Sequence, residues 1–191
     1  MSHSSLTDWG LKHVTIEKRF TILDVGCGGG RTIDKLAMLA AEGTIYGVDY
    51  AKGSVAASRS KNARWIKAGR VEIEEASVSR LPFPDNKFDL VTAVETQYYW
   101  PSPVTDMQEV LRVLKPGGAL IVIAESYKKG SYDKLQRPMM KLSKFARLSV
   151  GEHRELFSTA GYKDVQIFEE TCERLDLRDR DEALAPAVLA I

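Results

Sequence analysis

The segment that most constrains the fold is a nine-residue run, Ile22 to Gly30 (ILDVGCGGG), in which an apolar stretch leads directly into glycines. Apolar β-branched residues favour a buried strand, and glycines let the backbone turn sharply and approach a ligand closely. Apolar residues between Arg31 and Ala37 then recur at helical spacing. The run therefore predicts a strand, a glycine loop and a helix in succession, the outline of a nucleotide-binding site.

The spacing of the glycines distinguishes between kinds of nucleotide loop. The dinucleotide fingerprint G-x-G-x-x-G, counted from Gly26, requires a third glycine at position 31, where this chain has Arg31. The phosphate loop G-x-x-x-x-G-K-[ST] requires a lysine and a hydroxyl residue that do not follow here at that spacing. The chain has G-x-G-x-G instead. A glycine cluster alone also fits an ordinary turn.

An acidic residue further along supports a nucleoside site. Residues 44–48 predict a second short buried strand, and Asp49 follows it, 19 residues after Gly30. A carboxylate about 20 residues beyond such a loop can accept hydrogen bonds from both hydroxyls of a ribose. The alternative is that Asp49 only caps the helix that follows.

Strands and helices alternate through the rest of the chain. The pattern predicts further strands at 71–74, 88–94, 119–124 and 163–168, and a helix that begins at Pro103 after Ser102 and stops at Lys115-Pro116-Gly117-Gly118. Alternation of this kind predicts an α/β fold with a doubly wound, mainly parallel sheet and helices on both faces. Ligands of such sheets bind at the carboxyl ends of the strands.

Three segments together resemble the class I S-adenosylmethionine-dependent methyltransferases. They are the G-x-G-x-G loop behind Asp24, the connector Leu81-Pro82-Phe83 through Phe88-Asp89, and the stretch from Leu111 to Gly118 before the fifth predicted strand. The resemblance covers roughly Asp8 to Phe168 and is closest to the small-molecule branch that includes the ubiquinone and menaquinone methyltransferases. It implies a Rossmann-like sheet of six or seven strands, S-adenosylmethionine as cofactor, and methyl transfer to a small-molecule acceptor by in-line displacement.

The resemblance also implies a set of cofactor-binding residues. The glycine loop would hold the methionine end, Tyr50 would flank the adenine, and Glu95 would lie near the amino-acid tail. At the position of Ser77 the family often has an acidic residue, so contacts to the adenine edge would come partly from backbone. The complete set is Asp24, Gly26, Cys27, Gly28, Gly30, Asp49, Tyr50, Ser77, Val78 and Glu95.

The catalytic residues are not assigned by the sequence, because methyl transfer needs a general base only when the acceptor must lose a proton. Three residues are candidates: Tyr98, Tyr99 and His153. The aromatic cluster at residues 95–101 fits either a wall around a small organic substrate or a cover for the sheet edge. His153 fits either a base or a packed residue of a helix that begins with the capping box Ser149–Glu152.

We expect one methyltransferase domain over residues 1–191, in five parts. They are an N-terminal lid helix within 1–19, a cofactor-binding core at 20–125, a basic segment at 126–148, a helix and strand at 149–170, and an atypical tail at 171–191. Trp9 and His13 share one face of the expected lid. The basic segment fits a lid over the substrate, a membrane-surface helix or a packed helix with a solvated face. The highly charged tail fits a helix, an edge extension or a disordered end, and argues against a buried strand.

Composition argues against several other classes of protein. With a net charge of +1 and no basic run interleaved with aromatics, nucleic acid is not an expected partner. No apolar run approaches the roughly 20 residues that span a bilayer, and the polar N-terminus is unlike a signal peptide. We therefore expect a cytoplasmic protein without stable membrane insertion, of undetermined oligomeric state. Cys27 and Cys172 are far apart without a nearby histidine, so neither a disulfide framework nor a metal site is predicted.

Two other functions stay open alongside the methyltransferase. One is a nicotinamide-dependent oxidoreductase, which Arg31 at the third glycine position disfavours. The other is a catalytically silent module that keeps the cofactor fold without a substrate pocket.

Overall fold

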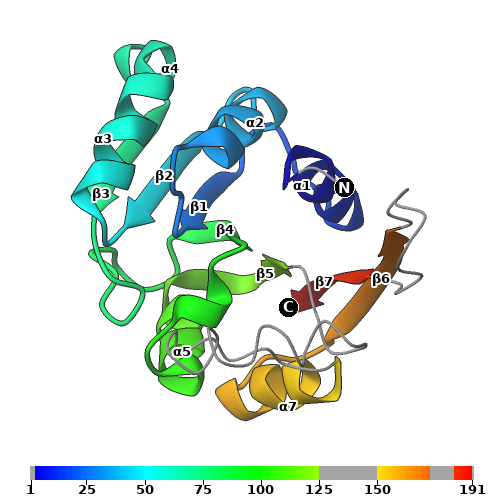
Figure 1. The fold of residues 1–191 in the computed structure, drawn as a ribbon. Helices are drawn as coiled ribbons and strands as arrows, with labels where there is room; N and C mark the ends of the chain where they lie inside the picture. The colour runs from blue at the N-terminus through cyan, green and yellow to red at the C-terminus, as the bar shows by residue number, and fades with distance from the viewer. Residues whose placement is uncertain (1–2, 125–149, 173–182, 191) are drawn as a thin grey trace.

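A single twisted sheet with helices on both faces organises residues 3–124, 150–172 and 183–190, which the computed structural model describes (Figure 1). The strands are β1 (Thr21–Val25), β2 (Thr44–Asp49), β3 (Val71–Glu75), β4 (Phe88–Val94), β5 (Leu114–Ile123), β6 (Gln166–Cys172) and β7 (Ala183–Ala190). The α-helices are α1 (His3–Gly10), α2 (Arg31–Leu39), α3 (Lys52–Lys61), α4 (Ala63–Lys67), α5 (Pro103–Val113) and α7 (Val150–Ala160), and η1 (Leu11–His13) and η2 (Gln97–Tyr99) are single 3₁₀ turns. No helix among these residues is long and apolar enough to cross a membrane.

Strands β1 to β5 pair in parallel, and the order of all strands is β3-β2-β1-β4-β5-β7-β6. The chain moves outward from β1 through β2 to β3 and then returns to the other side of β1 with β4. The crevice outside the carboxyl ends of β1 and β4 is therefore the topological switch point, where ligands of doubly wound sheets bind. The predicted mainly parallel, Rossmann-like α/β fold is confirmed.

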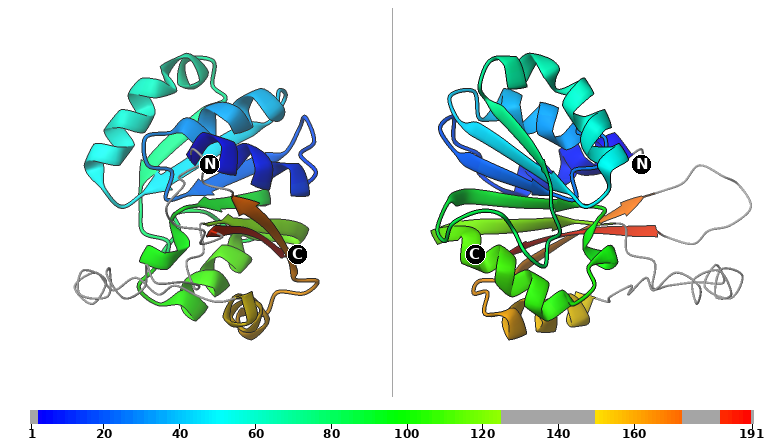
Figure 2. Two further views of the ribbon diagram at one scale, coloured as in Figure 1. Left: turned by 45° about the vertical axis from the view of Figure 1, so that its right-hand side comes forward. Right: turned by 90° about the vertical axis from the view of Figure 1, so that its left-hand side faces the viewer.

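Both faces of the sheet are covered, so the central strands are buried on both sides (Figure 2). Leu23 and Val25 of β1 face a core formed with α5 and α7, and Ile22 faces a second core formed with α1, α2 and α3. This alternation along β1 follows from the period of two in a strand. It leaves the strand ends, and not the faces, as places where polar groups can meet a ligand.

The edge beyond β5 is antiparallel. β7 pairs with β5 on one side and with β6 on the other. The expectation that residues 171–191 contain no inner strand is wrong for Ala183–Ala190, because this strand uses the apolar sequence ALAPAVLA and not the charged stretch before it. Most of that charged stretch, residues 173–182, lies outside the described residues, as does the predicted basic segment 126–148.

Element boundaries agree with the predicted signals at most points. β4 has the predicted bounds, α5 begins at Pro103, and α7 ends directly before Gly161, whose φ of +103° suits only glycine. The fifth strand differs, because it begins at Leu114 and not at Ala119. The predicted turn is an irregularity inside it, with a register shift opposite Phe88 and Leu90.

Gly30 is the position in the loop where a side chain would disturb the fold most. It precedes α2 with φ of +76°, and a Cβ there would lie 2.3 Å from both Ser58 Oγ and Asn62 Nδ2 of the neighbouring helical segment. We predict that Gly30→Ala lowers the free energy of unfolding by about 1–3 kcal/mol, measured by urea denaturation. Gly29→Ala is the matched control: a Cβ there meets nothing within 4 Å, so a change within about 0.5 kcal/mol is expected. Equal effects of the two substitutions would contradict this account.

Candidate functional site

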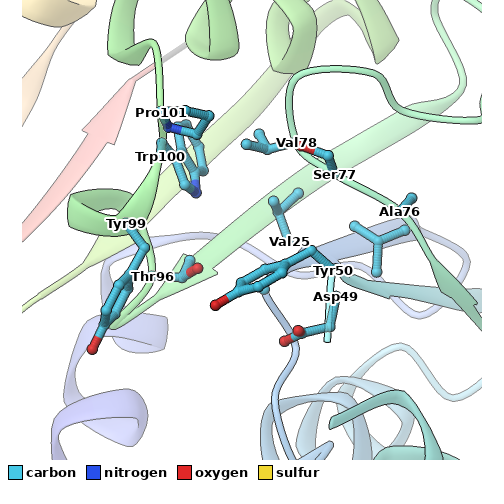
Figure 3. A pocket seen from close by; sticks show the side chains of 12 residues that line it. Val25, Asp49, Tyr50, Ala76, Ser77, Val78, Thr96, Tyr99, Trp100 and Pro101 are labelled. Carbon is cyan, nitrogen blue, oxygen red and sulfur yellow. The ribbon is translucent and has the colours of Figure 1, made fainter. Parts of the chain in front are cut away.

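A cavity of about 290 Å³ lies at the carboxyl ends of the parallel strands (Figure 3). Four chain segments line it: Val25 and Gly26 after β1; Val48, Asp49 and Tyr50 at the end of β2; Ala76, Ser77 and Val78 after β3; and Thr96, Tyr99, Trp100 and Pro101 after β4. The volume is close to the lower end of the range of about 300–1,000 Å³ that small-molecule sites occupy. The cavity therefore occupies the switch point that the topology marks.

The glycine loop is held tightly between two neighbouring segments. The backbone N–H groups of Gly26 and Cys27 both donate to the carbonyl of Val48, at 2.8 and 3.0 Å. Gly26 has a φ of +71°, and a Cβ at this position would lie 2.0 Å from Oγ1 of Thr96. Glycine is required here because the loop passes directly against the segment that follows β4.

Asp49 joins the glycine loop to the start of α3. One carboxylate oxygen accepts the N–H of Gly28 and the other accepts the N–H of Ala51, each at 2.9 Å. The N-cap of α3 is Ala51, so Asp49 does not occupy the helix-cap position that was the alternative. Each carboxylate oxygen has two lone pairs, so both can also accept a hydroxyl of a ligand in the cavity.

Asp24 is buried behind the loop and does not line the cavity. Its carboxylate accepts a hydrogen bond of 2.7 Å from the hydroxyl of Thr92 on β4. Burial raises the pKa of Asp24 to about 7, the Thr92 hydrogen bond opposes this rise, and the charge of Asp49 adds to it. Asp24 is thus poised between its neutral and ionised forms near neutral pH.

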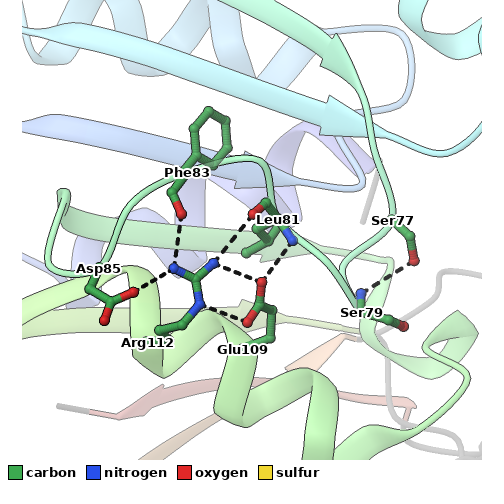
Figure 4. A network of polar contacts seen from close by, with 7 residues as sticks. All are labelled: Ser77, Ser79, Leu81, Phe83, Asp85, Glu109 and Arg112. Carbon is green, nitrogen blue, oxygen red and sulfur yellow. Dashed lines mark hydrogen bonds and ion pairs between the residues drawn. The ribbon is translucent and has the colours of Figure 1, made fainter.

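The loop after β3 is fixed to α5 by two side chains (Figure 4). Glu109 accepts the N–H of Leu81 at 2.8 Å, and Arg112 donates to the carbonyls of Phe83 and Leu81 at 2.9 and 3.3 Å. Glu109 and Arg112 also pair with each other, and this hydrogen bond lowers the pKa of Glu109. The network physically joins the connector to Glu109 and Arg112 of α5.

Two predicted cofactor residues, Cys27 and Gly30, face helices and not the cavity. The Cys27 thiol is buried 3.8 Å from Ser58 Oγ, and burial raises its pKa to about 12, so it stays protonated. Gly30 packs against the same helical segment. Their predicted contribution to ligand binding is therefore restricted to their backbone groups and to the shape of the loop.

Glu95 and Tyr98 form a hydrogen-bonded pair beside the cavity without lining it. The Tyr98 hydroxyl donates to Glu95 at 2.8 Å, and Glu95 has a φ of +55°, an unusual value for a residue with a side chain. Backbone strain of this kind costs on the order of 1–3 kcal/mol and is concentrated at functional sites. Tyr99 follows them, half-exposed, and lines the cavity.

His153 and the N-terminal helix do not reach the cavity. His153 lies on the buried face of α7 together with Leu156 and Phe157, as a packed residue would. The ring of His13 stacks on Phe168 at 4.0 Å and meets Trp9 edge-on at 4.9 Å. No described residue of α1 or η1 lines the cavity, so the predicted lid role of Trp9 and His13 finds no support in their positions.

Several lining residues carry no signal in a single sequence. Val25, Val48 and Ala76 are ordinary apolar residues at strand ends, and only the parallel register brings them to one wall. Tyr50 and Ser77, by contrast, belong to the predicted cofactor-binding set, and both line the cavity. The side chains of Tyr50 and Asp49 lie next to each other at one end of the cavity (Figure 3).

The chemistry of the lining fits a nucleoside without phosphates. An acceptor-only carboxylate at Asp49 suits a ribose diol, and the apolar and aromatic walls suit a planar base. No lysine or arginine is among the described lining residues, although a pyrophosphate would favour one. S-adenosylmethionine carries a ribose diol and a planar base without phosphates, whereas a dinucleotide adds a pyrophosphate to them.

Comparison with known proteins decides the family. Residues 23–122, more than half of the chain, match the family described as a methyltransferase domain. The chain belongs to this family. It is 33% identical to a demethylmenaquinone methyltransferase from Bacillus licheniformis over 125 residues, which are 65% of this chain and 53% of that protein. The matched part of the chain thus spans about half the length of this curated relative.

Solved structures support the same fold. A SAM-dependent methyltransferase from Aquifex aeolicus superposes with a TM-score of 0.74 at 20% identity, covering 100% of this chain and 98% of that one. The [4+2]-cyclase SpnF superposes with a TM-score of 0.76 at 21% identity, covering 97% and 79%. The predicted resemblance to class I S-adenosylmethionine-dependent methyltransferases is confirmed for fold and family.

The raised pKa of Asp24 predicts a pH-dependent stability. Its value is near 3.8 in the unfolded chain and about 7 in the folded one, so between these values the folded state holds a proton that the unfolded state releases. The free energy of unfolding therefore falls as pH rises through this window. The Asp24→Asn variant cannot ionise at this position, so it lacks this pH dependence of the free energy of unfolding.

We predict that urea denaturation at pH 5 and pH 8 shows wild type losing on the order of 2 kcal/mol relative to Asp24→Asn. Other titrating groups, including the histidines, are common to both proteins and cancel in the difference. A stability difference that is the same at both pH values would contradict the raised pKa.

Proposed function

We propose that this chain binds S-adenosylmethionine and transfers its methyl group to a small-molecule acceptor. The observation that carries the proposal is the position of Asp49. Its carboxylate is hydrogen-bonded to the glycine loop and lines a cavity at the switch point whose described lining has no lysine or arginine to bind a phosphate. When bound, S-adenosylmethionine supplies an electrophilic methyl group on a sulfonium. The remaining steps belong to residues of this chain.

The cofactor roles divide by position. Asp49 accepts the ribose hydroxyls, Tyr50 flanks the adenine, and Ser77 with Val78 contacts the adenine edge. The backbone of Gly26 and Gly28 holds the methionine end, with Asp24 and Glu95 near the amino-acid tail. Cys27 and Gly30 act through backbone and packing, as their contacts with α3 and the residue after it indicate.

The acceptor side is the part of the segment after β4 that carries Thr96 and Tyr99. Tyr99 and Thr96 line the cavity and can orient an acceptor, and the Glu95–Tyr98 pair lies beside them. In-line transfer depends mainly on positioning, so these residues need not exchange a proton with the acceptor. Of the candidate catalytic residues, Tyr99 is favoured by its place in the lining and His153 is disfavoured by its burial on α7.

A small organic acceptor is favoured by the apolar and aromatic walls and by the similarity to the Bacillus licheniformis demethylmenaquinone methyltransferase, whose name refers to a quinone. We also propose that residues 1–191 form one domain whose sheet has seven strands, with β7 antiparallel to β5. A cytoplasmic location, the absence of stable membrane insertion and the absence of a nucleic-acid partner belong to the same proposal.

Other chemistry on this fold is the main alternative, since a fold does not determine a reaction. The superposing protein SpnF is a [4+2]-cyclase, so this fold is not restricted to proteins named methyltransferases. A silent cofactor-binding module is the second alternative. Incubation with methyl-labelled S-adenosylmethionine and a small-molecule extract separates these: labelled product is expected, and label that stays entirely in the cofactor would contradict methyl transfer.

The ribose role of Asp49 predicts a binding defect. Asp49→Ala removes an acceptor of buried hydrogen bonds, so we expect S-adenosylhomocysteine to bind more weakly by about 1–3 kcal/mol, roughly tenfold to hundredfold, by calorimetry. Glu42→Ala is the matched control, because Glu42 pairs with Arg19 on the surface before β2, at the opposite end of that strand. Unchanged affinity in Asp49→Ala would limit Asp49 to its contacts within the protein.

A further inference from the structure

The indole of Trp100 presents an unused hydrogen-bond donor at the cavity. Trp100 is 6% exposed, and its Nε1–H is buried without a hydrogen-bond partner among the described residues. The residue lines the cavity, and in Figure 3 its nitrogen edge is directed toward the space between Val25 and Thr96. A buried donor without a partner is unfavourable, and such groups in native structures are rare enough to need a reason.

The position of this donor is fixed by the local backbone. The N–H of Trp100 donates to the carbonyl of Gln97 at 3.1 Å, which closes the turn of η2. Its φ of −69° and ψ of 128° are the extended values that a residue before proline, here Pro101, adopts. The ring packs in the core cluster that also contains Val78 and Val25. The indole is therefore held as part of a rigid wall.

The two ends of the cavity have opposite hydrogen-bonding character. Asp49 can only accept hydrogen bonds when ionised, and the indole of Trp100 can only donate one. The lining also includes the apolar residues Val25, Val48 and Ala76. A ligand that satisfies both ends must carry hydroxyl donors at one end and a planar group with an unprotonated acceptor atom at the other, which is the pattern of a purine nucleoside.

We propose that Trp100 is a specificity-determining residue that donates its indole N–H to a ring nitrogen of the adenine base. The inference rests on the proposed function and extends it to a residue outside the expected cofactor-binding set. A base with carbon in place of that nitrogen leaves the indole N–H unpaired, so the site discriminates against it.

The most direct test uses the unmodified protein and three analogues of S-adenosylhomocysteine in which carbon replaces nitrogen at purine position 1, 3 or 7. Calorimetry is expected to show one analogue binding about tenfold more weakly than S-adenosylhomocysteine. If all three bind within twofold of the parent compound, no ring nitrogen accepts the Trp100 N–H and the inference is overturned. This test needs no variant and is independent of whether a variant folds.

A variant then assigns the effect to Trp100. Trp100→Phe keeps an aromatic ring but lacks the donor, so it should bind S-adenosylhomocysteine about tenfold more weakly and show no further loss for the sensitive analogue. Trp65→Phe is the matched control, since the Trp65 indole donates to Asp34 outside the cavity. The affinity of this variant for S-adenosylhomocysteine should be unchanged. Wild-type affinity in a folded Trp100→Phe variant would overturn the inference.

The outcomes separate the two levels of the proposal. Failure of the wild-type protein to bind S-adenosylhomocysteine at all would overturn the proposed function together with this inference. Normal binding without any dependence on the ring nitrogens would leave the function standing and overturn only the role of Trp100.

Discussion

The carboxylate of Asp49 is the interaction on which the site depends. By accepting the N–H groups of Gly28 and Ala51, it joins the glycine loop after β1 to the start of α3 and fixes both at the switch point of the sheet. The same carboxylate faces the cavity, where its remaining lone pairs are available to hydroxyl groups. Fold and binding are coupled through this residue, because the groups that shape the loop also shape the ligand site.

A second constraint comes from hydrogen bonds between α5 and the connector after β3. Arg112 of α5 donates to backbone carbonyls of the connector after β3, and Glu109 accepts a backbone N–H there. Two segments that are far apart in the sequence, the connector and the Leu111–Gly118 stretch, are therefore parts of one structure. Their joint presence in the chain is physically explained, since Arg112 of one segment donates to backbone carbonyls of the other.

The elements that depend on local chemistry could be predicted from the sequence. The apolar run into glycines located β1 and α2, the spacing to Asp49 located β2, and Ser102-Pro103 located the start of α5. The prediction for Ala183–Ala190 was wrong, because it rested on the charged residues before this segment. The short apolar strand itself pairs with β5 and β6.

The side-chain directions in the site could not be predicted for a similar reason. Whether Cys27 faces α3 or the ligand, and whether Trp100 covers the sheet edge or lines a cavity, depends on how separate strand ends meet. The predicted roles of the individual site residues remain predictions, supported by position for Asp49, Tyr50, Ser77 and Val78. Asp24 is a different case, since its raised pKa follows from burial in the folded sheet, and the hydrogen bond from Thr92 of β4 opposes that rise.

The central claim is that this switch-point cavity is built for a phosphate-free nucleoside cofactor. Calorimetric titration of the wild-type protein with S-adenosylhomocysteine and, separately, with NAD tests it most directly. We predict saturable binding of S-adenosylhomocysteine in the micromolar range and no binding of NAD. Binding of NAD without binding of S-adenosylhomocysteine would contradict it.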